Sequence, residues 1–143
     1  MDSIWMETEL PRFPKLEGDR RTDVLVVGGG MAGLLCTYML RKQGVDCLLL
    51  EDNRIMDGIS GNTTAKITSQ HGLIYHRLLE GFGFETAGLY LESQQQAVAQ
   101  FRELCDTMDC DFSEQDSFVF TRGNRKALED ALEALRLLRC PAS

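Results

Sequence analysis

Residues 23–33 read DVLVVGGGMAG, and this stretch decides how the chain folds. After Asp23 comes a short, mostly β-branched apolar run, which is typical of a strand covered on both faces in a parallel sheet. Three glycines then interrupt the run. From Met31 to about Gln43 the apolar residues recur at helical spacing. The order predicts a strand over residues 23–27, a tight glycine turn and a helix.

A second strand follows the helix. Arg41 and Lys42 suit the end of a helix, where cations interact favourably with its dipole, and Gly44 supplies a stop. Residues 45–50 are again apolar and predict a strand. Strand, glycine turn, helix and strand make one βαβ unit. We therefore predict an α/β fold, with a Rossmann-type βαβ unit, additional helices and an incomplete parallel sheet.

The glycine turn matches the GxGxxG pattern of dinucleotide-binding proteins. Gly28 permits the tight turn, Gly30 lets a pyrophosphate approach the backbone, and Gly33 lets the helix pack closely on the strand. The N–H groups of the first helical turn, around Met31 and Ala32, have no partner within the helix and point toward a bound anion. These residues are candidates for binding a dinucleotide.

Glu51 lies at the tip of the second predicted strand, 23 positions after Gly28. A carboxylate there can accept hydrogen bonds from the adenosine ribose hydroxyls, and it repels a 2′-phosphate, which disfavours NADP. Arg54, nearby, weakens this exclusion slightly. The motif reads only the ADP half of a dinucleotide, so it leaves FAD and NAD open.

The remaining elements are mostly helical. Residues 52–64 are rich in turn formers and predict a loop. Asn124 is suited to cap a final helix. The pattern further predicts helices over residues 73–80 and 86–108 and a strand over residues 118–121. A helical stripe is expected in the core: Ala97, Phe101, Leu104, Cys105 and Met108.

Composition narrows the function classes. The 143 residues carry 22 acidic and 15 basic side chains, and a net charge of −7 disfavours a nucleic-acid partner. No apolar run approaches the roughly 20 residues of a membrane span. The first residues lack the layout of a signal peptide, so we expect a cytoplasmic location. Five cysteines without a CxxC pattern predict no metal site, and Cys36 and Cys47 are expected to be buried thiols.

Several segments of the sequence resemble those of a known family. Residues 23–33, continued through Leu50 and Glu51, resemble the D-amino-acid-oxidase-like family of FAD-dependent oxidoreductases. Residues 58–68 stand where that family has its second FAD-contacting loop. Residues 60–75, SGNTTAKITSQHGLIY, resemble the branch that carries a C-terminal Rieske domain, as do residues 3–8 and 110–112. The resemblance implies an FAD cofactor and contacts to it from Ser60, Thr63, Thr64 and Ala65, with Lys66 the weakest candidate.

The resemblance also implies a function. It is the oxidation of an amine-like small molecule by hydride transfer to flavin, with no catalytic side chain assigned in this chain. Family members run to several hundred residues, so the chain resembles only their N-terminal part. We expect a polar arm over residues 1–22, and a partial FAD-binding domain with the start of the substrate-domain segment over residues 23–143. Thr37 stands where the family usually has Ala or Gly.

Several expectations follow for the chain by itself. It should be inactive alone and prone to self-association through exposed sheet edges. Two other functions stay open, a fragment of an NAD-dependent dehydrogenase and a non-catalytic dinucleotide-binding module. The Cys-x-His ligand pairs of a Rieske cluster are absent from the sequence. His71 and His76 are five positions apart, on different faces of a helix, so they are poor joint metal ligands, and a hydrogen-bonded structural role is favoured for His71.

Overall fold

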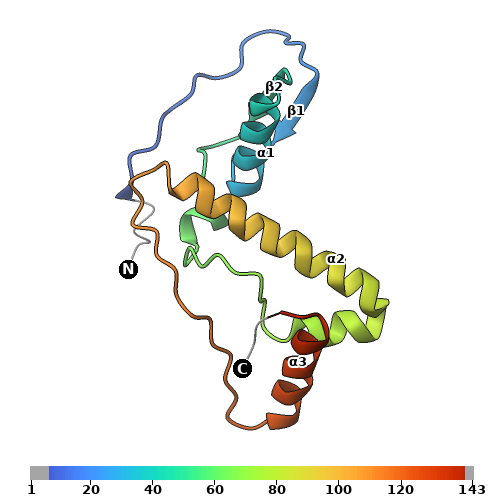
Figure 1. The fold of residues 1–143 in the computed structure, drawn as a ribbon. Coiled ribbons are helices and arrows are strands. Elements are labelled where there is room, and N and C mark those ends of the chain that lie inside the picture. The colour runs from blue at the N-terminus through green and yellow to red at the C-terminus, as the bar shows by residue number, and fades with distance from the viewer. Residues whose placement is uncertain (1–6, 141–143) are drawn as a thin grey trace. The chain divides into compact units, whose positions relative to one another are not determined.

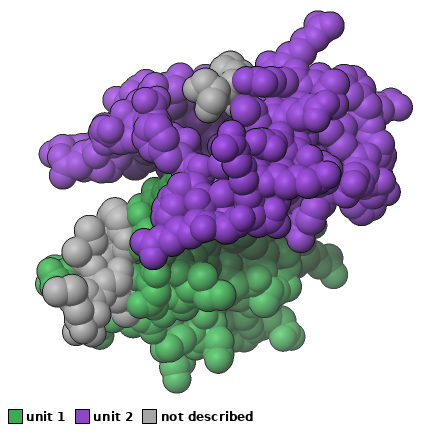
Figure 2. Space-filling model, turned by 90° about the horizontal axis from the view of Figure 1, so that it is seen from below, with its two compact units in different colours: residues 1–66 green, residues 67–143 purple. Residues whose placement is uncertain are grey.

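The computed structural model describes residues 7–140, which form an α/β structure of helices and a two-stranded parallel sheet (Figure 1). The chain divides into two compact units, residues 1–66 and 67–143, shown in separate colours in Figure 2. Each unit is described by itself. The elements of the first are β1 (Val24–Val27), α1 (Met31–Lys42), β2 (Cys47–Leu50) and η2 (Ile59–Asn62), and those of the second are α2 (Ile74–Cys105) and α3 (Arg125–Leu137).

The first unit contains the predicted βαβ arrangement. β1 and β2 run parallel, with Val24 opposite Cys47 and Val27 opposite Leu50. The Gly28 N–H continues the ladder by donating to the Leu50 carbonyl oxygen at 2.8 Å. The predicted strand and helix positions are confirmed to within two residues, because the apolar runs and the glycine breaks mark both ends of each element.

Only one face of this sheet is covered by α1. Side chains alternate across β1, and those of Leu25 and Val27 are 52% and 79% exposed. The prediction that the first strand is covered on both faces is therefore wrong for the described residues. Within the described part of the first unit, α1 is the helix that packs on the sheet, and Leu25 and Val27 lie on the face away from it.

The hydrophobic core lies in the second unit, where α2 and α3 pack together. Its buried side chains are Tyr75 and Leu91 of α2 and Ala134 and Leu135 of α3. Burial raises the pKa of Tyr75 to about 12, and its neutral hydroxyl donates to the Ser69 carbonyl oxygen. Within the described residues, all fully buried hydrophobic side chains belong to this unit.

The capping prediction for the last helix is confirmed. The Asn124 side-chain oxygen accepts a hydrogen bond from the Ala127 N–H at 3.1 Å. α2 combines the two helices predicted over residues 73–80 and 86–108 into one element with a break at Gly83. Gly83 has φ of 78° and ψ of 174°, and the helix bends there (Figure 1). The break falls inside the predicted gap.

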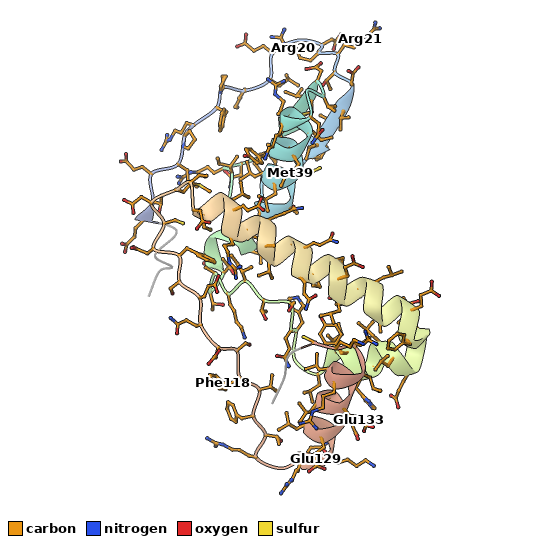
Figure 3. The ribbon with its side chains drawn as sticks, viewed as in Figure 1. Arg20, Arg21, Met39, Phe118, Glu129 and Glu133 are labelled. Carbon is orange, nitrogen blue, oxygen red and sulfur yellow. The ribbon has the colours of Figure 1, made fainter. Side chains whose placement is uncertain are left out.

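Two further predictions are wrong. Residues 118–121 form no strand, and Phe118 and Phe120 are 81% and 79% exposed. Figure 3 shows Phe118 on an extended segment of the chain. An extended segment becomes a strand only with a neighbour to accept its hydrogen bonds, and none is present among the described residues. The predicted core stripe on α2 contains no fully buried residue, because α3 packs against the part of α2 before it. That stripe comprises Ala97, Phe101, Leu104, Cys105 and Met108.

The remaining sequence-based predictions concern the N-terminal arm, two cysteines and the loop after β2. Residues 8–22 of the predicted arm have no helix or strand, and nearly all are exposed. The prediction of a buried thiol is wrong for Cys36, which lies on the exposed side of α1, while Cys47 in β2 is half-buried. Residues 52–64 form the predicted loop, with η2 inside it. No helix in the described part of the chain is both long and apolar enough to cross a membrane.

Candidate functional site

The glycine turn joins β1 to α1 in the way that the motif predicts. Gly28 has φ of +106°, a conformation that side chains strongly disfavour, so the chain can leave the strand sharply. A Cβ on Gly33 would lie 1.9 Å from the Gly28 carbonyl oxygen. The structure therefore gives Gly33 its predicted role, the close approach of helix and turn.

Both backbone polar groups of Gly29 form hydrogen bonds. Its N–H donates to the Glu51 carboxylate (Oε2) at 2.6 Å, and its carbonyl oxygen accepts from the Met56 N–H at 2.9 Å. A Cβ at Gly29 would lie 2.9 Å from Ile55 Cγ2 and 3.1 Å from Glu51 Cβ. Sequence reasoning missed this residue, because GxGxxG allows any side chain at its second position.

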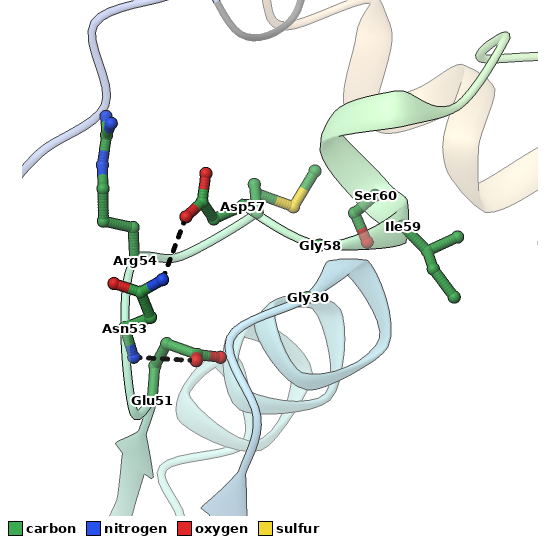
Figure 4. A pocket seen from close by; sticks show the side chains of 9 residues that line it. Gly30, Glu51, Asn53, Arg54, Asp57, Gly58, Ile59 and Ser60 are labelled. Carbon is green, nitrogen blue, oxygen red and sulfur yellow. Dashed lines mark hydrogen bonds between the residues drawn. The ribbon is translucent and has the colours of Figure 1, made fainter.

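Glu51 follows the last residue of β2, as predicted, and its side chain reaches back to the glycine turn. Its second oxygen (Oε1) accepts from the Asn53 N–H at 3.1 Å (Figure 4). The hydrogen bonds from Gly29 and Asn53 lower the pKa of Glu51, so its carboxylate stays ionised at neutral pH. Each oxygen retains a further lone pair that a ribose hydroxyl could use.

Ser60 is brought to the start of α1 by η2. Its hydroxyl oxygen accepts the Met31 N–H at 2.9 Å and would lie 3.2 Å from a Cβ on Gly30. Gly30 is the N-cap of α1 and has no side chain for capping. Ser60 therefore supplies the cap from 30 positions along the chain, with its hydroxyl directed at the first turn (Figure 4).

A cavity of about 300 Å³ opens between these segments (Figure 4). Its volume lies at the lower end of the range for small-molecule sites. The cavity carries two carboxylates and one guanidinium. Asn53 shapes it by donating its side-chain N–H to Asp57 at 3.2 Å. The lining residues are Gly30, Glu51, Asn53, Arg54, Met56, Asp57, Gly58, Ile59 and Ser60.

Other candidates lie outside this lining. The Thr63 hydroxyl accepts the Ala65 N–H at 3.2 Å, which turns the chain at Ala65, where φ is +55°. Thr64, Ala65 and Lys66 are exposed. The loop thus brings Ser60 to the glycine turn and leads the next residues away from the cavity. Asn53 and Asp57 are lining residues that no motif in the sequence indicates.

Three remaining residues have structural partners. The Thr37 hydroxyl donates to the Gly33 carbonyl oxygen at 2.8 Å, so its polar group is satisfied within α1. His71 is hydrogen-bonded to Gln94 at 3.3 Å, which is the structural role predicted for it, and His76 lies 3.4 Å from Glu80. Among the described residues, no group of three or more His, Cys, Asp or Glu side chains is arranged to bind a metal.

The comparison with protein families decides the assignment. Residues 23–142 match the sequence pattern of a protein family that is described as DAO, FAD dependent oxidoreductase. The chain belongs to the DAO family of FAD-dependent oxidoreductases. FAD is accordingly the cofactor, which resolves the choice that the glycine motif leaves between FAD and NAD. The family resemblance seen in the sequence is confirmed.

Three individual proteins are similar to this chain. YhfW of Bacillus subtilis, whose name describes a Rieske 2Fe-2S iron-sulfur protein, is 38% identical over 131 residues, which are 90% of this chain and 26% of YhfW. Gamma-glutamylputrescine oxidoreductase of Escherichia coli is 28% identical over 109 residues, 75% of this chain and 26% of that enzyme. OrdL of Rhizobium meliloti, named as an oxidoreductase, is 38% identical over 60 residues, 40% of this chain and 14% of OrdL. The resemblance to the Rieske-bearing branch agrees with the match to YhfW.

The chain spans about a quarter of the length of YhfW and of gamma-glutamylputrescine oxidoreductase. No solved structure matches it significantly. The donors at the glycine turn nonetheless fit the DAO-family cofactor. A Cβ on Gly30 would intrude toward Ser60, and the N–H groups of the first turn of α1 suit a phosphate.

Proposed function

We propose that residues 23–66 form the ADP-binding part of a Rossmann-type FAD site. In this proposal Gly28, Gly30, Met31, Ala32 and Gly33 surround the pyrophosphate, and Glu51 binds the adenosine ribose. Residues 23–143 are then a partial FAD-binding domain that includes the start of the substrate-domain segment, preceded by the arm over residues 1–22.

The observation that carries the proposal is the contact between Glu51 and the glycine turn. The carboxylate lies at the end of a parallel strand, beside the turn and at the edge of the cavity. This is where nucleotides bind in open α/β sheets, at the carboxyl ends of the strands. An ionised carboxylate there favours two free ribose hydroxyls and opposes a phosphate on the 2′ oxygen.

Ser60 supports the pyrophosphate assignment. Its hydroxyl accepts the Met31 N–H and still has its own proton to donate. A phosphate oxygen at this position would receive that proton, while the first turn of α1 contributes its N–H groups and its positive dipole end. Thr63, Thr64 and Ala65 are proposed to contact more distant parts of the cofactor, as the family resemblance implies.

The proposed reaction is the oxidation of an amine-like small molecule. The bound flavin supplies the chemistry by accepting a hydride. This chain's own residues position the ADP half, and we assign none of them a catalytic role. The likeness to gamma-glutamylputrescine oxidoreductase supports an amine substrate.

Flavin fluorescence titration of the Gly30→Val variant tests the binding site. A branched side chain at Gly30 would occupy the place proposed for the pyrophosphate, so we expect FAD affinity to fall at least about tenfold. Gly123→Val is the matched control, because a Cβ at Gly123 meets nothing within 4 Å. Unchanged FAD affinity in a folded Gly30→Val protein would contradict the proposed site.

A further inference from the structure

Two cysteines lie together at the end of α2. Cys105 is the last residue of the helix, and the chain turns there as the Met108 N–H donates to the Cys105 carbonyl oxygen at 3.0 Å. Cys110 returns to the same point, with its sulfur 3.9 Å from that carbonyl oxygen. The Cys105 carbonyl oxygen, one of those at the end of the helix that no helical N–H uses, therefore accepts from both the Met108 N–H and the Cys110 thiol.

The returning segment is tied at a second point. Arg102, one turn before Cys105, forms an ion pair with Glu114. Asp111 has φ of +50°, which redirects the chain immediately after Cys110. The Cys110 sulfur therefore stays over the last turn of α2.

The two thiols differ in exposure. Cys110 is exposed, whereas Cys105 is half-buried. Burial, a hydrogen bond between the two thiols and the nearby Asp106 raise the pKa of Cys105. Cys110 is thus the thiol that meets a reagent from solvent, and its sulfur lies 3.9 Å from the carbonyl oxygen of the residue that carries the second thiol.

We propose that Cys105 and Cys110 form a reversible intramolecular disulfide when the protein meets a hydroperoxide. The Cys110 thiolate attacks the peroxide, its S–O bond forms as the O–O bond breaks, and the departing oxygen leaves as water or an alcohol after protonation. The Cys105 thiol then attacks the sulfenic sulfur of Cys110. The S–S bond forms, the S–O bond breaks, and the hydroxyl leaves as water with the Cys105 proton. Two thiols are oxidised and one peroxide is reduced.

The other cysteines lack this arrangement. Cys36 is exposed on α1, and the Cys47 thiol donates to the Thr37 carbonyl oxygen at 3.8 Å. The sulfur of Cys140 lies 4.0 Å from the side-chain nitrogen of Gln95. Burial raises the pKa of Cys140, which disfavours its thiolate. Cys105 and Cys110 are therefore the two cysteines placed to form an intramolecular disulfide.

Peptide mapping of the 143-residue chain tests the proposal. Trypsin cuts after Arg102 and Arg122, so one peptide, residues 103–122, contains both thiols and no other cysteine. After treatment with hydrogen peroxide, we expect this peptide to lose two hydrogen atoms in mass and to regain them with dithiothreitol. Met108, in the same peptide, gains an oxygen when oxidised, which gives a different mass.

Three serine variants complete the test. Cys105→Ser and Cys110→Ser should no longer show the loss of hydrogen, whereas the matched control Cys36→Ser should show it unchanged. The proposal would be overturned if wild-type peptide 103–122 kept both thiols or stopped at a sulfinic acid on Cys110. A peroxide-induced disulfide between two chains would overturn it as well, and a non-reducing gel detects that product.

Discussion

The Glu51 carboxylate accepts the Gly29 N–H at 2.6 Å, and this bond connects the end of β2 to the turn that follows β1. The same side chain accepts the Asn53 N–H, so one carboxylate orders both the glycine turn and the loop that lines the cavity. Glu51 therefore fixes the backbone of the glycine turn and of the loop, in addition to its proposed contact with the ribose.

Replacement of Glu51 should affect both roles. We expect Glu51→Ala to weaken FAD binding roughly tenfold or more, because a charged acceptor is lost and the turn loosens. Glu51→Gln should be milder, since its single oxygen can still accept one of the two N–H groups. Asp52→Ala removes a neighbouring exposed charge and serves as the control in fluorescence titration. Equal FAD affinity in wild type and Glu51→Ala would refute the ribose assignment.

The contribution of Glu51 should depend on pH. Its hydrogen bonds lower its pKa below the ordinary value of 4.5, so the folded state favours the carboxylate. The resulting stabilisation is fully present above pH 4.5 and is lost as the pH falls through the lowered pKa. We expect the difference in thermal unfolding between wild type and Glu51→Gln to be constant near neutral pH and to shrink below pH 4.5. A difference that grew on acidification would contradict this linkage.

Gly29→Ala tests the close packing around the turn. The new Cβ would lie 2.9 Å from Ile55 Cγ2, and overpacking of this kind costs about 1–3 kcal/mol in the free energy of unfolding. The double variant Gly29→Ala with Ile55→Ala should recover part of the loss, because the obstructing methyl is gone. Gly123→Ala is the control. Denaturant unfolding measures these proteins, wild type and the single variant Ile55→Ala, and no coupling between positions 29 and 55 would count against the contact.

The open face of the sheet should promote self-association of residues 1–143. Leu25 and Val27 leave apolar surface in water, at a cost of about 25 cal/mol per Å². We expect light scattering after size exclusion to show dimers or larger species, and Leu25→Glu to reduce them. Leu89→Glu, at a leucine of α2 that is also exposed, is the matched control. A monomer at all concentrations would show that the face needs no cover.

The sequence predicts the βαβ unit well because its signals are local. A β-branched run, three glycines and a helical repeat mark each boundary, and Asn124 marks the start of α3 in the same way. The role of Gly33 is also predictable, since the motif describes a backbone contact within the unit.

The remaining features depend on contacts across the chain. Gly29 must be glycine because of Ile55 and Glu51, which no short pattern relates to it. The bond from Met31 to Ser60 spans 29 positions and follows from the path of the loop. Phe118 and Phe120 have strong strand propensity, yet that propensity cannot supply a neighbouring strand. The expected core stripe fails for a related reason, because helical periodicity identifies an apolar face without identifying what covers it.

The continuity of the βαβ unit bears on how the protein is synthesised. The glycine turn, the Glu51 contact, the Ser60 cap and the cavity all come from residues 24–60, and β1 pairs directly with β2. The loops that these contacts close are short, so closing them costs little chain entropy. On the ribosome, every residue that makes these contacts is synthesised before the buried side chains of α2 and α3. The proposed ADP site and the hydrophobic core therefore come from separate, successive stretches of the chain.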